Sequence, residues 1–109
     1  MLLKKYLEEK NYESGGIRMM AIANGNYVYG IEVRFPATLY ESDKDAFTAM
    51  VNVLNRRSGG VLKVVSTWEE FHSGILSFRV AFCNHAYTDK QVMECMELLL
   101  RDIFPSFSK

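Results

Sequence analysis

The chain alternates between segments in which apolar residues recur at helical spacing and segments with the two-residue alternation of strands. Helical spacing over residues 2–12 predicts a first helix. Strands over residues 17–23 and 27–35, joined at Asn24-Gly25, predict a β-hairpin, because this pair favours the left-handed conformation of a tight turn. The second strand places charged Glu32 and Arg34 opposite an apolar face, which predicts an antiparallel sheet covered on one side. That apolar face is formed by Tyr27, Tyr29, Ile31, Val33 and Phe35.

The rest of the chain repeats this plan. Ser42 is suited to cap a second helix, and Pro36 leaves a third strand at Thr38–Tyr40 uncertain. Strands over 61–68 and 75–83, with a loop through Glu69, His72 and Gly74 between them, predict a second hairpin. Thr88 and Gln91 form a capping box, which predicts a last helix over residues 89–104. The expected core stripes of the second and last helices are Phe47, Met50, Val51 and Leu54, and Val92, Met96, Leu99 and Ile103.

The two halves resemble each other. Ser14-Gly15-Gly16 and Ser58-Gly59-Gly60 each follow a helical segment and precede a strand, which predicts a helix stop in equivalent places. The apolar residues of the strand at 29–35 align with those at 76–82. We therefore predict one α+β domain over residues 1–109, in the order α-β-β-(β)-α-β-β-α, with an antiparallel sheet of two hairpins packed against helices and pseudo-twofold halves.

Composition narrows the class of partner. The 109 residues carry 13 basic and 13 acidic side chains, so the formal net charge is zero. Nucleic acid is a poor partner for such a chain, because phosphate binding needs a positive field. We expect no membrane span and no signal peptide, since the chain has no long apolar run and is charged from its fourth residue. The chain reads as a cytoplasmic protein with Cys83 and Cys95 reduced.

The stretch from Leu54-Asn55-Arg56-Arg57 through Ile75–Val80 to Thr88-Asp89-Lys90-Gln91, followed by Leu98-Leu99-Leu100, resembles the YbjN family. That family is similar in fold to type III secretion chaperones. The resemblance implies a small α+β protein that acts as a dimeric adaptor or regulator. It implies no catalytic residue. Its first half would hold three strands, so Pro36 departs from the pattern.

The candidate chemistry is sparse. Cys83 and His85 would share a face if extended, with Asp89 near enough in sequence to orient the imidazole, as in a small cysteine enzyme. Cys83, Cys95, His72 and His85 make up the whole set of soft metal ligands, and their spacing matches no zinc module. The two Ser-Gly-Gly triplets lack the lysine of a phosphate-binding loop. We therefore expect no catalytic residues, no metal and no cofactor.

Surplus apolar residues indicate a partner instead. Leu98 and Phe104 stand off the predicted stripe of the last helix, and Phe107 follows it. Consecutive Met19 and Met20 must point to opposite faces of their strand. Apolar residues on two faces of one element predict a second buried surface. We interpret the chain as a non-enzymatic homodimeric chaperone-like or adaptor module that binds polypeptide through Leu98, Phe104 and Phe107. The alternatives are a ligand-sensing domain with a pocket between sheet and helices, and a cysteine enzyme.

Overall fold

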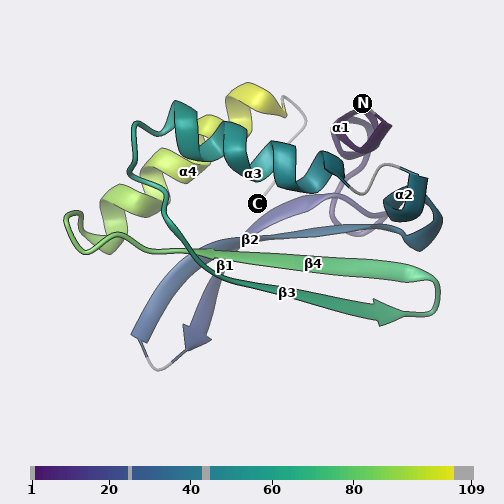
Figure 1. Ribbon diagram of the computed structural model, residues 1–109, viewed down its shortest axis with the longest axis horizontal. Coiled ribbons are helices and arrows are strands. Elements are labelled where there is room, and N and C mark those ends of the chain that lie inside the picture. Colours follow the sequence, from purple (N-terminus) through teal and green to yellow (C-terminus); the bar gives the residue numbers. More distant parts are fainter. Residues whose placement is uncertain (1, 25, 43–44, 105–109) are drawn as a thin grey trace.

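The computed structural model describes residues 2–24, 26–42 and 45–104 (Figure 1). Within these residues the chain forms four helices and four strands. In chain order they are α1 (Leu2–Glu9), β1 (Ile17–Asn24), β2 (Asn26–Pro36), α2 (Ala37–Ser42), α3 (Asp45–Arg57), β3 (Val64–His72), β4 (Ile75–Phe82) and α4 (Asp89–Ile103).

The strands form one antiparallel sheet in the order β1-β2-β4-β3. All four helices lie on the same side of it (Figure 1). The predicted α+β class, with two hairpins packed against helices, is confirmed. The central strands β2 and β4 lie beneath the helices, whereas β1 and β3 are the two edges of the sheet.

The core lies between the helices and the central strands. On β2, Ile31, Val33 and Phe35 of the predicted apolar face are buried. The opposite face differs from the expectation, because Glu32 is also buried, at 2% exposed. Helix α3 is anchored on β4 by Phe47, whose ring stacks on that of Phe78 at a centroid distance of 3.7 Å. The buried apolar residues of the sheet and of the helices belong to one cluster, so both hairpins share a single core.

The two central strands show the predicted relationship between the halves. Alignment of β2 on β4 at an offset of 47 residues carries Glu32 onto Arg79, and these two residues are direct partners in the sheet. A twofold axis that passes between them would exchange the two strands. The second predicted helix stop is confirmed, because α3 ends at Arg57 and the triplet that follows it contains left-handed Gly59 (φ 64°) and Gly60 (φ 90°). The first differs from the expectation: α1 ends at Glu9, and left-handed Gly15 belongs to a later turn in which its amide donates to the Tyr12 carbonyl at 3.2 Å.

The region after β2 differs from the expectation. Residues Thr38–Tyr40, considered for a third strand, belong to helix α2. The sheet ends here, because Pro36 is paired with Ile75 and the Ala37 amide donates to the Gly74 carbonyl at 2.9 Å. Ser42 is the last residue of α2 rather than the cap of the next helix. The predicted turn residue Gly25 lies outside the described residues.

The second hairpin is shifted and longer than predicted. The segment from Val61 to Lys63 is not strand, because the Ser58 hydroxyl accepts a hydrogen bond from the Leu62 amide at 3.1 Å and Asn55 donates to the Leu62 carbonyl at 3.1 Å. Strand β3 instead continues through the expected loop to His72. Ser73 (φ 51°) and Gly74 (φ 78°) then form a two-residue turn in which both residues are left-handed.

Helix α4 begins as predicted, with the reciprocal Thr88 and Gln91 hydrogen bonds of a capping box. Its buried stripe differs from the expected one. The helix buries Val92, Met96 and Leu100, and Phe104 at its C-cap is also buried, whereas Leu99 and Ile103 are partly buried. The stripe follows a spacing of four residues, which keeps it on the face toward β2.

Candidate functional site

The three predicted partner-binding residues do not form one surface. Leu98 is 69% exposed, as expected, but Phe104 is completely buried. The expectation that Phe104 contacts a partner is wrong, because the C-terminal end of α4 places its ring in the core. Phe107 lies outside the described residues.

Leu98 is surrounded by charged side chains of its own helix. Glu94, Glu97 and Arg101 lie around it. Arg101 donates to Glu97 at 2.9 Å, and Lys90 lies 3.9 Å from Glu94. A single exposed leucine among ion pairs is common on protein surfaces, so Leu98 alone does not define a binding site.

A small cavity lies between β1 and α4. Its volume is about 200 Å³, and it is lined by Met19, Met20, Ala21, Tyr29, Met93 and Glu97. Flexible thioether side chains adapt to different apolar groups. The cavity is below the usual range of roughly 300–1,000 Å³ for small-molecule sites. Its size suits one apolar side chain or a very small ligand.

Among the described residues, most of the exposed large apolar side chains lie on strand β3. Eight of its nine residues are exposed, and Ser66 is half-buried. The exposed fractions of its large apolar residues are 36% for Val64, 48% for Val65, 37% for Trp68 and 59% for Phe71. Among the described residues, the other exposed large apolar side chains are Tyr87 and Leu98. One edge of the sheet therefore concentrates apolar side chains next to unpaired backbone groups.

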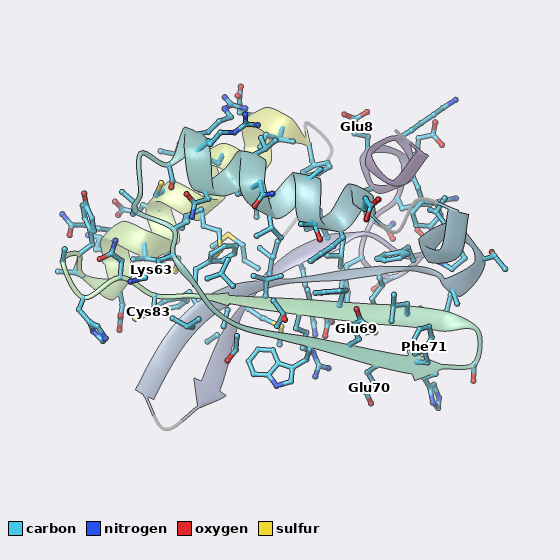
Figure 2. All side chains as sticks on the ribbon, viewed as in Figure 1. Glu8, Lys63, Glu69, Glu70, Phe71 and Cys83 are labelled. Carbon is cyan, nitrogen blue, oxygen red and sulfur yellow. The ribbon has the colours of Figure 1, made fainter. Side chains whose placement is uncertain are left out.

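Side chains of β3 are exposed on both faces of the sheet. Glu69 and Phe71 point toward the helix side, and Glu70 points away from it (Figure 2). Trp68 is paired with Arg79 and Glu69 with Phe78, so Trp68 lies on the face opposite the helices. Thr67, Glu69 and Phe71 lie on the helix side of β3 and are all exposed, so the helices leave this strand uncovered. Strand β3 thus offers two faces and one free edge.

The face opposite the helices is held together by charge. Glu32, only 2% exposed, lies between Arg18 at 3.2 Å and Arg79 at 2.5 Å. Its hydrogen bond raises the pKa of Arg79 above the ordinary value. The Arg18 guanidinium also stacks 4.0 Å from the Tyr12 ring centroid. Both arginines are therefore paired with Glu32 within the protein. These ion pairs connect β1, β2 and β4 on the face opposite the helices.

The residues considered for catalysis or metal binding do not converge. Strand β4 ends at Phe82, and Asn84 turns the chain through a hydrogen bond from the Ala86 amide at 3.0 Å, so Cys83 and His85 do not share a strand face. Cys83 lies beside Lys63, whose carbonyl accepts its amide at 2.9 Å (Figure 2). Burial raises the pKa of the Cys95 thiol. In the described part of the chain, no three His, Cys, Asp or Glu side chains are grouped as metal ligands.

Strand β3 was not among the predicted site residues. The available signal was the apolar pair Val64-Val65 followed by Trp68 and Phe71, which places apolar residues on both faces of one strand. The prediction of a loop through Glu69 and His72 differs from the structure, in which these residues belong to β3. The exposed edge strand is therefore longer than the sequence predicts.

Comparisons with known proteins add no identification. No family model, curated protein or solved structure matches the chain. The resemblance to the YbjN family stays a prediction. Among the described helices, none has the length and apolar character needed to cross a membrane.

Proposed function

We propose that this protein is a non-enzymatic adaptor or chaperone-like module that binds extended polypeptide as a fifth strand along β3. The observation that carries the proposal is the exposure of β3, an edge strand with apolar side chains on both faces. In this mode of recognition main-chain hydrogen bonds provide affinity, and alternate side chains provide specificity.

The side chains of β3 support a particular chemistry for the bound segment. Phe71 lies on the helix side of the strand and Trp68 on the opposite side, so apolar residues on both faces of an added strand would be buried. Glu69 and Glu70 place a carboxylate on each face. Cross-strand pairs of opposite charge are favourable. A segment with apolar residues and a lysine or arginine opposite these glutamates fits best.

As part of this proposal, the protein forms a homodimer and is located in the cytoplasm. Phe104 is buried, so the exposed surface that best supports a dimer is β3 rather than the last helix. Cys83 and Cys95 are free, as cysteines usually are in a reducing compartment.

Suppression of aggregation of the reduced insulin B chain tests the proposal, because this chain is extended and apolar. We expect the protein to delay aggregation at near-equal molar ratio, and Phe71→Lys to abolish the delay. Leu98→Lys is the matched control, since it makes the same change at another exposed apolar residue. Equal loss in both variants, or full activity of Phe71→Lys, would contradict the proposal.

The cavity between β1 and α4 favours a second candidate, the sensing of a very small apolar ligand. Benzene would then raise the melting temperature of the protein. Ala21→Phe, which places a ring at the lining of the cavity, would remove the rise. An equal rise in both proteins would exclude this site.

A further inference from the structure

We propose that β3 of the free protein pairs with β3 of a second copy, antiparallel and centred on Trp68, and that this self-pairing occupies the polypeptide surface. The inference rests on the proposed function, since it assigns a regulatory state to the same strand. An exposed edge strand is a template for pairing with another chain. The occupant is identified by the order of side chains along β3.

Symmetry restricts the ways in which two copies can pair. In an antiparallel pair related by a twofold axis perpendicular to the sheet, one residue must lie opposite its own copy. That central residue defines the whole register. Direct partners also share a face of the sheet. The register of β3 with β4 is regular from Ser66 to His72, because the one irregularity lies between Val64 and Ser66.

Most centres give unfavourable pairs. A centre at Glu69 or Glu70 places two carboxylates directly opposite each other, which is destabilising. A centre at Thr67 places polar Ser66 opposite apolar Trp68. A centre at Ser66 leaves Phe71, the most exposed apolar residue of the strand, beyond the end of the partner strand.

A centre at Trp68 gives complementary pairs along the strand. Thr67 then lies opposite Glu69 of the second copy, with both on the helix side. Ser66 lies opposite Glu70, with both on the other side. Each hydroxyl can donate a hydrogen bond to the carboxylate across from it. Trp68 meets its own copy on the face opposite the helices, so the largest side chain of the strand pairs with an apolar side chain. Phe71 then lies opposite the irregular segment of the second copy that contains Val64 and Val65.

This pairing has a consequence for regulation. It would join two four-stranded sheets into one eight-stranded sheet with β1 at both outer edges. The backbone groups and side chains that pair with the second copy are those proposed to bind polypeptide. A polypeptide must therefore displace the second copy, and dissociation of the dimer makes the surface available.

Light scattering on a matched pair of variants tests the register. We expect the protein to have twice its 12.5 kDa chain mass at micromolar concentration. Thr67→Glu places two pairs of carboxylates opposite each other and should weaken the dimer by about tenfold or more. Thr67→Lys forms two ion pairs with Glu69 and should leave the dimer at least as tight.

Circular dichroism checks that both Thr67 variants are folded. If one of them is unfolded, the pair Ser66→Glu and Ser66→Lys repeats the comparison, because Ser66 lies opposite Glu70 in the proposed register. A monomeric protein, a higher oligomer or equal dimerisation of the Glu and Lys variants would overturn the inference.

The insulin B-chain assay separates this inference from the proposed function. We expect monomeric Thr67→Glu to delay aggregation at a lower protein concentration than Thr67→Lys. A dimer with the predicted charge dependence but no effect on the B chain would contradict the proposed function while supporting self-pairing. If the unsubstituted protein is monomeric and still delays aggregation, the proposed function is supported and self-pairing is overturned.

Discussion

Replacement of Glu32 by glutamine removes the negative charge from the centre of the sheet. The Glu32 carboxylate is 2% exposed and is contacted by Arg18 from β1 and Arg79 from β4. Glutamine keeps the volume of the side chain, so the change leaves no cavity. It leaves two guanidinium groups facing an uncharged amide.

The exposure of the two arginines determines how much Glu32→Gln lowers the free energy of unfolding. Removal of one partner of a fully buried ion pair costs about 3–5 kcal/mol. The Arg18 and Arg79 side chains are 40% and 39% exposed, so water continues to solvate them after the change. We therefore expect Glu32→Gln to lower the free energy of unfolding by about 1–3 kcal/mol, below the fully buried case.

Urea unfolding followed by circular dichroism measures this difference, and Glu70→Gln is the matched control. Glu70 also lies near Arg79, at 3.7 Å, but its side chain is 65% exposed. Its replacement should change the free energy of unfolding by less than about 0.5 kcal/mol. Equal effects of the two substitutions would refute the reasoning that burial decides the contribution.

Three further predictions concern the core, a thiol and the last helix. Phe47→Ala and Met96→Ala should each cost about 2–5 kcal/mol and shift a single unfolding transition, because both residues belong to one core cluster; two transitions in a thermal scan would contradict the shared core. The Cys95 thiol should react with iodoacetamide more slowly than in the unfolded chain, because burial raises its pKa. The stability that this thiol contributes should be complete below the ordinary pKa of 9.0 and be lost as the pH rises above it, and Cys95→Ser should flatten that decline in urea unfolding. Leu98→Asp should change the unfolding free energy by less than about 0.5 kcal/mol and leave the dimer intact by light scattering; a monomeric variant would return the interface to the last helix.

Local patterns predicted most of the fold. The alternation on β2 identified its buried face because Ile31, Val33 and Phe35 meet the helices. The capping box at Thr88 fixed the start of α4, since its hydrogen bonds form within four residues. The equivalence of β2 and β4 in the two halves was also predicted from the offset of 47 residues, because that offset matches the apolar positions of one strand with those of the other.

Tertiary contacts decided the features that local patterns did not predict. Residues 37–42 form α2 because β4 begins at Ile75, opposite Pro36, and offers no pairing beyond it. Strand β3 extends to His72 because β4 pairs with it throughout, although Glu69-Glu70 is typical of a solvated loop. Phe104 is buried because, at the C-cap of α4, it continues the four-residue spacing of the buried stripe. The candidate site moved from the last helix to β3 for these reasons.

Hydrogen exchange on the complex with reduced insulin B chain tests most directly whether β3 accepts an added strand. The exchange is measured by mass spectrometry on monomeric Thr67→Glu. We expect the amides of residues 65–72 to exchange more slowly when the B chain is bound, because those that face away from β4 become hydrogen-bonded. The amides of β1, at the opposite edge, should be unchanged. Protection at β1 or α4 with none at β3 would contradict the central claim.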